Sequence, residues 1–415
     1  MAFIKTPVRG MPEQTPLEME LRNYVLNQIR KVYHSYGFLQ IETPAIEHIE
    51  NLTGDQGGEN EKLMFRLLKR GDSLERALKE QGELSAEGLR FDLTVPLTRF
   101  YANNMSDLPI PFKVMQTGPV WRADRPQRGR FRQFMQCDID ILGEASKLAE
   151  IELISATAEA LSSLGFEDLV VKINDRRILR AMALYAGFPE DQLSDIYILL
   201  DKMDKIGFTG LRDELIAAGY LPESIDKYLG LFRELPESTL SRAYFESNPE
   251  ILSDLEIFEN LDQILSATRE LTGPEVSIIF DPTLVRGMSY YTGTIFEISL
   301  PGMAGSVAGG GRYDEMIEKY VNQPVPACGF SIGFERIIVL LEEQGMIPGF
   351  TDPRTAYLLD KDLETDRIIE LMQEAANRRV NGETIFIATR RRNVRRQIEE
   401  LEELGYTQFE EFFPE

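Results

Sequence analysis

The chain has 415 residues, of which 43% are hydrophobic and 27% charged, and its formal net charge is −23 at pH 7. This length predicts two or three domains, and the acidic charge argues against unspecific nucleic-acid binding, although a local basic patch could still dock one RNA. With only two cysteines and two histidines, the sequence argues against a zinc site and against a histidine-based catalytic triad. It contains neither a signal-peptide core nor an apolar run of membrane-spanning length, so we expect a cytoplasmic protein without a membrane partner.

The N-terminal region predicts a helix followed by an edge strand. Thr15 and Glu18 fit a capping box, with Pro16 at the first helical position. Apolar residues then recur at helical spacing until a stop near Gly37: Leu21, Val25, Ile29, Val32 and Tyr36. Residues 38–46 predict a strand that is broken by Pro44, which a sheet tolerates only at an edge or a bulge.

Residues 90–102 predict a short strand and the start of a helix. Asp92 and Thr94 are two residues apart, so on a strand their side chains point the same way. A carboxylate and a hydroxyl on one face can receive an ammonium group. The alternative is that one of them only caps the following helix.

Residues 112–143 predict two strands joined by a basic loop. In the second strand, at 131–142, Gln136, Asp138 and Asp140 share one face and apolar side chains share the other. The loop contributes four arginines: Arg122, Arg125, Arg128 and Arg130. A floor of carboxylates and an amide beside these arginines suits a ligand with a cationic end and a phosphate end. The alternative is an ordinary hairpin with one solvated face.

Residues 144–164 predict a helix, 168–173 a strand, and 175–272 an almost wholly helical region without evident chemistry. A strand at 276–280 leads to Tyr290 and Tyr291, which we expect on opposite faces, so that only one of them lines a site. Gly309-Gly310-Gly311 predicts close approach of another group to the backbone, or a flexible loop. Residues 329–343 predict a strand turning into a helix, where Arg336 in the first turn could bind an anion. Neither a P-loop nor a Rossmann glycine pattern occurs.

After a linker at 346–353, the tail predicts a strand–helix–strand–helix order that ends with the chain. The strands are expected at 355–359 and 384–388, and the helices at 363–379 and from Val394 to Leu404. The run TRRRNVRR at 389–396 predicts a nucleic-acid contact, with a solvated charged face as the alternative.

Five segments together resemble class II aminoacyl-tRNA synthetases, in the version carried by histidyl-tRNA synthetases. They are residues 112–143, RFDLTVPLTRFYA at 90–102, VRGMSYYTGTIFE at 285–297, GGGRYD at 309–314 and GFSIGFERI at 329–337. The resemblance covers roughly residues 1–345. It implies an α/β (α+β) fold, with an antiparallel sheet flanked by helices.

The resemblance also implies three domains and a homodimer. The catalytic domain would comprise residues 1–170 and 273–345, with a helical insertion at 171–272. A short anticodon-binding-like α/β domain would follow at 354–415. In the family, the N-terminal helix and strand build the dimer interface, and the insertion contacts the acceptor arm of tRNA.

By resemblance, the protein activates histidine with ATP and transfers it to tRNA(His), with Mg²⁺ bridging the phosphates. Arg122 would hold the α-phosphate, Arg286 would stabilise the transition state, and Arg336 would hold the far phosphates. The implied ATP-binding residues are Arg122, Asp124, Arg312 and Arg336. The implied histidine-binding residues are Asp92, Thr94, Gln136, Asp140, Tyr290 and Tyr291. The tRNA-binding candidates are Arg390, Arg391, Arg392, Arg395 and Arg396. The sequence does not assign the ligands of Mg²⁺.

The chain departs from the family pattern at four points. Asp124 stands where most members carry Glu, Met135 where relatives have Tyr or His, and Ser289 where they have Asp or Asn. The C-terminal domain is also short. Two alternatives therefore stay open beside the ligase: the non-catalytic regulatory subunit of ATP phosphoribosyltransferase, and a free-standing histidine-activating enzyme that does not use tRNA. Retention of the three phosphate-binding arginines and the acidic pocket favours the ligase.

Overall fold

The structure, a computed structural model, describes residues 3–53, 63–126, 129–235, 242–285, 290–301, 305–345 and 354–414. The chain divides into two compact units. The first comprises Met1–Pro12 and Leu26–Val339, and the second comprises Glu13–Val25 and Leu340–Glu415. Among the described residues, every helix is too short or too polar to cross a membrane.

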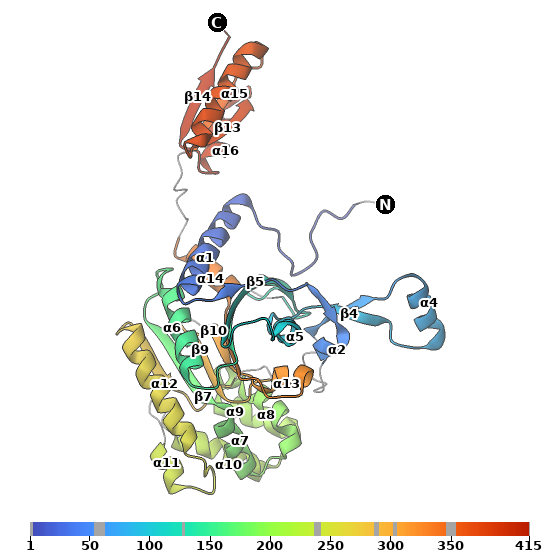
Figure 1. The fold of residues 1–415 in the computed structure, drawn as a ribbon, viewed down its shortest axis with the longest axis vertical. Helices are drawn as coiled ribbons and strands as arrows, with labels where there is room; N and C mark the ends of the chain where they lie inside the picture. Colours follow the sequence, from blue (N-terminus) through green and yellow to red (C-terminus); the bar gives the residue numbers. More distant parts are fainter. Residues whose placement is uncertain are drawn as a thin grey trace. The chain divides into compact units, whose positions relative to one another are not determined.

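An eight-stranded sheet forms the centre of the first unit (Figure 1). Its strands, in spatial order, are β1 (Leu39–Gln40), β5 (Phe112–Trp121), β6 (Gln133–Leu142), β11 (Ala327–Ile332), β10 (Ser306–Arg312), β9 (Thr294–Ser299), β7 (Leu169–Asp175) and β8 (Val276–Phe280). Pairing is antiparallel from β5 to β7, and only the two outermost pairs are parallel. The predicted antiparallel sheet flanked by helices is confirmed.

Helices cover both faces of this sheet. Helix α6 (Leu148–Ser162) packs against β6, β10 and β11, and α14 (Phe334–Glu343) follows β11 directly. Helices α5 (Thr94–Asn104) and α13 (Glu315–Val321) share a buried cluster with Phe112 and Val114 of β5. Val114 lies opposite Asp140 of β6 in register, so α5 and α13 lie on the face that carries the β6 carboxylates.

The N-terminal helix begins as the sequence predicts, but the strand after it does not. Helix α1 (Pro16–Ser35) starts at a capping box: the Thr15 amide donates to Glu18 at 2.6 Å, and the Glu18 amide donates to Thr15 Oγ1 at 3.4 Å. The single strand expected at 38–46 is wrong. The chain forms β1 and then β2 (Ile46–His48) in a different sheet. Pro44 lies between them, and it has no N–H to donate to a ladder.

A small sheet carries the segment that precedes the helix α5. Its strands are β2, β4 (Ser85–Leu89) and β3 (Phe65–Leu68), paired antiparallel. Helix α2 (Ile49–Thr53) follows β2, and α4 (Gly71–Glu80) connects β3 to β4. This sheet delivers Arg90 and Asp92 to the edge of the large sheet, because both residues come directly after β4.

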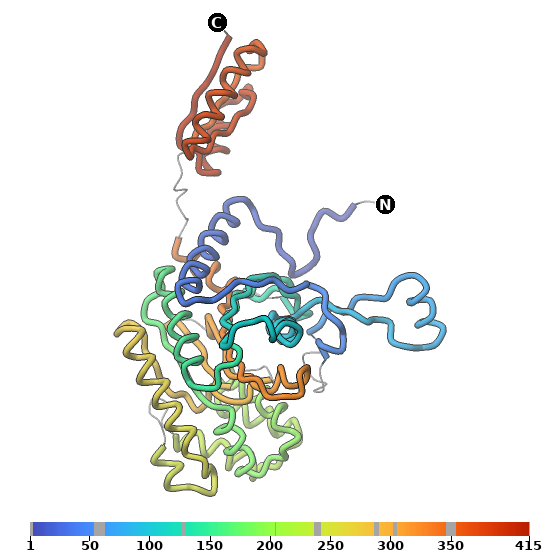
Figure 2. Tube along the Cα trace, viewed as in Figure 1, coloured from blue at the N-terminus to red at the C-terminus, as the bar shows by residue number. Residues whose placement is uncertain are grey.

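The region between β7 and β8 is helical, as its sequence predicts. It contains α7 (Arg176–Ala186), the 3-10 turn η1 (Glu190–Gln192), α8 (Leu193–Leu200), α9 (Met203–Ala217), α10 (Pro222–Glu234), α11 (Arg242–Ser247) and α12 (Glu256–Thr272). Edge-to-face contacts join Phe188 to Tyr220 and Tyr228, with ring centroids 5.3 Å apart. Figure 2 shows the chain leaving the sheet after β7 in green and returning beside it through α12 in yellow.

The C-terminal residues form a parallel sheet between two helices. Its strands have the order β13 (Thr384–Thr389), β12 (Arg354–Leu359), β14 (Gln408–Phe412). Helix α15 (Thr365–Val380) packs on the face with Tyr357 and Leu359, and α16 (Val394–Glu402) packs on the face with Ala356 and Leu358. The sequence predicts that this domain ends at its second helix, but a third strand, β14, follows that helix.

Candidate active site

The candidate site is built on the polar face of β6. Gln136, Asp138 and Asp140 are only 9%, 4% and 3% exposed, and the alternating residues Cys137 and Ile139 are fully buried on the other face. The predicted alternation of β6 is therefore confirmed. Its polar side is not a solvated surface, because three ionisable or amide side chains are enclosed there. Buried polar groups of this kind need partners from the protein or from a ligand.

Glycines near β6 make room for Asp140, for Arg90 and for the neighbouring strand. Gly329 lies opposite Asp140, and a Cβ atom at Gly329 would overlap Asp140 Oδ1. Gly118 lies opposite Gln136, and a Cβ atom there would lie 2.5 Å from Arg90 Nη2. At Gly310, a Cβ atom would overlap the backbone of Gly329. The sequence predicts that another group approaches the backbone of the glycine triplet. At Gly310 this group is the backbone of the neighbouring strand β11.

Asp92 has one oxygen engaged and one oxygen unpaired. Its Oδ1 accepts a hydrogen bond from the Val95 amide at 3.0 Å, at the start of α5. Its Oδ2 is buried and has no hydrogen-bond partner among the described residues. Burial raises the pKa of Asp92, and the nearby Arg122 opposes the rise. The helix-capping alternative is therefore correct for one oxygen and leaves the other available to a cation.

The Gln136 amide likewise has one end that is hydrogen-bonded and one end without a partner among the described residues. Its Nε2 donates to both Asp138 oxygens at 3.4 and 3.5 Å and to Ser331 Oγ at 3.3 Å. Its Oε1 is buried without a partner in the described part of the chain. Because the carboxylate of Asp138 holds the NH₂ end, the carbonyl end faces away from it. Asp92 and Gln136 thus each present one unsatisfied acceptor.

Asp140 is paired with a residue that the sequence analysis did not select. The Tyr313 hydroxyl donates to Asp140 Oδ1 at 2.5 Å. Burial raises the pKa of Asp140 well above its usual range, and the neighbouring Asp138 adds to the rise. Tyr313 belongs to the GGGRYD segment, which was recognised as a motif without a role for this tyrosine.

The two tyrosines of the YYTG segment lie together. The ring centroids of Tyr290 and Tyr291 are 4.8 Å apart, and Tyr290 lies 6.0 Å from Tyr313. Burial raises the pKa of Tyr290, and the neighbouring Thr94 opposes the rise. The expectation that they point to opposite faces is wrong, because β9 begins only at Thr294 and the tyrosines precede the strand. The structure therefore brings Thr94, Tyr290 and Tyr291 together.

Arg122 is the loop arginine nearest the carboxylates. Its Nε donates to the Phe91 carbonyl at 2.9 Å, and its guanidinium lies 5.1 Å from the centroid of the Phe134 ring. Its positive charge acts on the pKa of both Asp92 and Asp138, opposing the rise that burial causes. The remaining N–H groups of Arg122 are the means by which it could bind a phosphate.

The other predicted phosphate contacts lie on separate segments. The Asp124 carboxylate accepts from Arg130 Nε at 3.0 Å, and the Asp124 carbonyl accepts from Arg132 Nε at 3.0 Å. Arg336, in the first turn of α14, donates to the Ser306 carbonyl at the start of β10. Arg286 and Ser289 lie outside the described residues.

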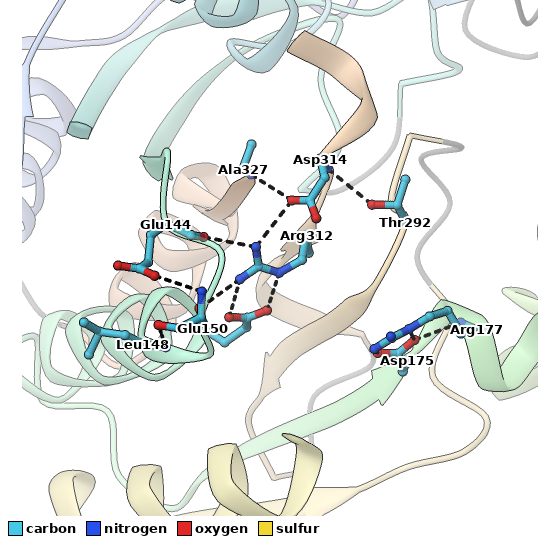
Figure 3. Close-up of polar contacts among 10 residues, drawn as sticks. Glu144, Leu148, Glu150, Asp175, Arg177, Thr292, Arg312, Asp314 and Ala327 are labelled. Atoms are coloured by element: carbon cyan, nitrogen blue, oxygen red, sulfur yellow. Dashed lines mark hydrogen bonds and ion pairs between the residues drawn. The ribbon is translucent and has the colours of Figure 1, made fainter. Parts of the chain in front are cut away.

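Arg312 is fully engaged within the protein (Figure 3). Its Nε and Nη2 bind the Glu150 carboxylate, both at 2.7 Å. Its other contacts are the carbonyls of Glu144 and Ser146, both at 3.2 Å, and the Asp314 carboxylate at 3.3 Å. A guanidinium has five N–H donors, and all five are used here. The expectation that Arg312 binds ATP is therefore not supported, because it has no donor left for a phosphate.

Most arginines of the C-terminal basic run are paired with glutamates. The pairs are Arg390 with Glu411, Arg391 with Glu400, Arg395 with Glu399, and Arg396 with Glu400. Arg392 is exposed and forms no ion pair with the described residues. Exposed pairs of this kind are weak, so they reduce the local positive charge without locking the side chains.

Comparisons with known proteins agree with these motifs. The family model for histidyl-tRNA synthetase matches residues 10–337. A histidine–tRNA ligase of Leifsonia xyli subsp. xyli is 42% identical, and the alignment covers 99% of this chain and 95% of that protein. A probable histidine–tRNA ligase of Tropheryma whipplei is 41% identical over 89% of this chain and 87% of that protein.

Solved structures give the same fold. The crystal structure of histidyl-tRNA synthetase from Nostoc sp. PCC 7120 aligns with a TM-score of 0.77 and 28% identity, over 97% of this chain and 90% of that one. A Bacillus halodurans protein described as an ATP phosphoribosyltransferase regulatory subunit/histidyl-tRNA synthetase aligns over both entire chains, with a TM-score of 0.76 and 21% identity. That second likeness concerns the fold alone. Relatives at 36–42% identity that are named histidine–tRNA ligases do not favour the regulatory alternative. The chain belongs to the histidyl-tRNA synthetase family.

Proposed function

We propose that this chain is a histidine–tRNA ligase that joins histidine to ATP as histidyl-adenylate and then transfers the histidyl group to tRNA(His). The observation that carries the proposal is the pair of unsatisfied buried acceptors, Asp92 Oδ2 and Gln136 Oε1, beside the acidic Asp140–Tyr313 pair. A small ligand with an ammonium group and an aromatic N–H meets both needs. Histidine has both groups.

In this proposal the histidine ammonium lies between Asp92 Oδ2 and Gln136 Oε1, with Thr94 beside them. Asp140 accepts the imidazole N–H, and Tyr290 and Tyr291 enclose the ring. An ammonium placed there donates hydrogen bonds to two buried oxygens that otherwise have no donor among the described residues. These hydrogen bonds contribute more free energy than the same contacts would in water. The imidazole N–H likewise compensates the burial of the Asp140 carboxylate.

The activation step is an in-line displacement. A histidine carboxylate oxygen forms a bond to the α-phosphorus of ATP, and the bond from that phosphorus to the pyrophosphate oxygen breaks. The carboxylate is already ionised near neutral pH, so no general base is required. Arg122 holds the α-phosphate, Arg286 stabilises the charge of the transition state, and Arg336 binds the far phosphates. Positioning and charge stabilisation therefore supply the catalysis.

Four further assignments belong to this proposal. Asp124 supports the ATP-binding loop, and Mg²⁺ bound with ATP would supply positive charge to its phosphates. The active species is a cytoplasmic homodimer that pairs through the N-terminal helix and strand. Residues 1–170 and 273–345 form the catalytic domain, residues 171–272 the insertion and residues 354–415 the anticodon-binding domain. The arginines of the C-terminal run contact tRNA.

Histidine-dependent exchange of pyrophosphate into ATP tests the activation step. We expect exchange that requires histidine and is not supported by other amino acids. Charging of tRNA(His) then tests the transfer step, and charging without exchange activity is not possible under this mechanism. A folded protein that gives no exchange would refute the proposal. Exchange without charging would restrict the protein to activating histidine.

A further inference from the structure

We infer that Asp138, together with Ser331, is a positioning residue that holds the Gln136 amide with its carbonyl oxygen toward the substrate ammonium. This inference rests on the proposed function and deepens it. Asp138 does not itself touch histidine in this arrangement. It acts through Gln136, by deciding which end of the amide faces the pocket.

The Gln136 amide is hydrogen-bonded to both of the other side chains. Gln136 and Asp138 are two residues apart on β6, so they lie on the same face, and Ser331 on β11 lies opposite Asp138 in register. Gln136 Nε2 donates to both Asp138 oxygens and to Ser331 Oγ. The NH₂ end of the Gln136 amide is therefore held by two acceptors, the Asp138 carboxylate and the Ser331 hydroxyl.

The neighbouring side chain on the other flank does not compete for Asp138. Gln116 on β5 also lies opposite Asp138 in register. Its Nε2 donates to the Leu93 carbonyl at 3.0 Å, and its Oε1 accepts from Thr43 Oγ1 at 3.1 Å. Both ends of this amide are satisfied elsewhere. The Asp138 carboxylate is thus left to Gln136 and Ser331.

The direction of the Gln136 amide decides whether the pocket attracts or repels an ammonium. A carboxylate can only accept, so it selects the NH₂ end of the amide. If the amide turned over, Nε2 would face the ammonium and Oε1 would face the carboxylate, so two unfavourable contacts would replace two favourable ones. A neutral Asn at position 138 can accept or donate and therefore does not enforce one direction.

Asp138→Asn tests this assignment in the full-length protein, with histidine affinity measured by calorimetry and KM values measured in the exchange assay. We expect the Kd and the KM for histidine to rise about tenfold, the equivalent of one charge-assisted hydrogen bond. The KM for ATP should stay within about twofold, because the ATP contacts are not changed. Ser331→Ala should also raise the Kd and the KM for histidine, but by a smaller factor.

A double-mutant cycle separates positioning from a direct charge effect. In a Gln136→Ala background there is no amide to orient, so Asp138→Asn should change histidine affinity by less than about twofold. An undiminished loss in that background would overturn the inference in favour of direct attraction. An unchanged histidine Kd in the single Asp138→Asn variant would overturn it as well.

Asp281→Asn is the matched control. Asp281 is a buried aspartate after β8, paired with Lys172 at 3.0 Å, and this variant should leave histidine affinity unchanged. If the parent protein neither binds histidine nor supports exchange, the proposed function fails. If the parent is active and Asp138→Asn behaves like Asp281→Asn, only the positioning role fails.

Discussion

Asp92 and Gln136 illustrate how much of the site depends on single oxygen atoms. Each presents one buried acceptor that has no hydrogen-bond partner among the described residues. An unsatisfied buried acceptor costs about 1–3 kcal/mol of stability. The protein without histidine therefore carries this cost, and a ligand that donates to the two oxygens removes it. Folding of the flanking segments maintains this arrangement, because Asp92 also binds the first turn of α5 and Gln136 also binds Asp138.

Asp92→Asn is expected to weaken histidine binding without loss of fold. Asparagine can still accept from the Val95 amide, so the start of α5 is preserved. The negative charge beside the ammonium is lost, and we expect the KM for histidine to rise about 10- to 100-fold. The exchange assay measures the KM, and thermal unfolding checks the fold. A variant with parental KM would exclude Asp92 from the ammonium site.

Histidine affinity is expected to depend on the ionisation of Asp138. Burial raises the pKa of Asp138 to about 7, and Asp92 adds to the rise while Ser331, Arg122 and Arg90 oppose it. Below this pH the protonated carboxyl can donate, so it no longer selects the NH₂ end of Gln136. The KM for histidine should therefore rise as pH falls from about 8 to about 6. The titratable or charged groups around Asp138 are Asp92, Asp140, Arg122, Arg90, Tyr290 and, through the sheet, Tyr33.

Asp138→Asn supplies the control for that pH profile. Histidine itself titrates in this range, so the parental profile contains a substrate contribution. The variant retains the substrate contribution and lacks the Asp138 contribution. Its KM should vary less between pH 8 and pH 6 than that of the parent. Superimposable profiles would assign the whole dependence to the substrate.

The same substitution is expected to increase stability. The pKa of Asp138 is higher in the folded protein than its ordinary value of 3.8, so the folded state binds the proton more tightly. Ionisation therefore destabilises the fold progressively as pH rises from about 4 to about 7. Asp138→Asn removes this penalty, and its free energy of unfolding should exceed that of the parent by about 1 kcal/mol or more above pH 7. Urea unfolding at pH 5 and pH 8 measures the difference, which should be larger at pH 8.

Sequence reasoning recovered part of the site because residue type and spacing carry local information. Gln136 and Asp140 stood out through the strand alternation of β6, and Asp92 was identified through the resemblance to the family. Arg312 was assigned to ATP because a motif shows a guanidinium but not the acceptors around it, which come from Glu144, Ser146 and Glu150 far along the chain and from Asp314 close by. Tyr313 was missed since its partner Asp140 lies 173 positions away.

At the scale of elements, the paired strands β6 and β11 carry the polar side chains of the candidate site. Period-two alternation predicted β6 and both of its faces. It failed for Tyr290 and Tyr291, because both residues precede β9, which begins only at Thr294. It also failed for β14, whose residues Gln408–Phe412 include two glutamates that make it resemble a polar tail. Alternation thus locates a strand only where one face is buried.

Gly329→Ala is expected to damage both the pocket and the fold. A Cβ atom at position 329 would overlap Asp140 Oδ1, so the strand or the carboxylate must move. Overpacking of this kind costs about 1–3 kcal/mol, and displacement of Asp140 should sharply reduce histidine affinity. Chemical denaturation and histidine titration measure the two effects.

Gly230→Ala is the matched control for that substitution. Gly230 lies within α10, where an added Cβ atom meets nothing within 4 Å. Alanine in a helix interior should stabilise by roughly 0.5–1 kcal/mol and leave histidine affinity unchanged. Equal behaviour of the two alanine variants would contradict the role of Gly329 as the residue that makes room for Asp140.

At the scale of the whole molecule, the protein is strongly acidic and carries a short basic run near its C-terminus. The proposed activation of histidine and the proposed binding of tRNA therefore depend on different charged residues. The net charge of −23 gives tRNA no general attraction, so binding depends on local arginines. The proposed histidine and ATP contacts fall between residues 92 and 336, and the basic run lies after residue 389. Composition revealed the run, but only the structure shows that glutamates of α16 and β14 offset most of it.

Arg392→Ala is expected to weaken tRNA(His) binding more than the same change at its paired neighbours. Arg392 is the exposed arginine of the run without an ion pair to the described residues, so its charge is the most available to a phosphate. Loss of one phosphate contact should raise the KM for tRNA several-fold and reduce the slope of log affinity against log salt by about 1. Arg367→Ala, at an exposed pair with Glu370 on α15, is the control and should change neither value. Histidine-dependent exchange should be the same in both variants, because activation does not involve tRNA. If Arg392→Ala leaves the salt slope unchanged, the run is a solvated face and tRNA is held elsewhere.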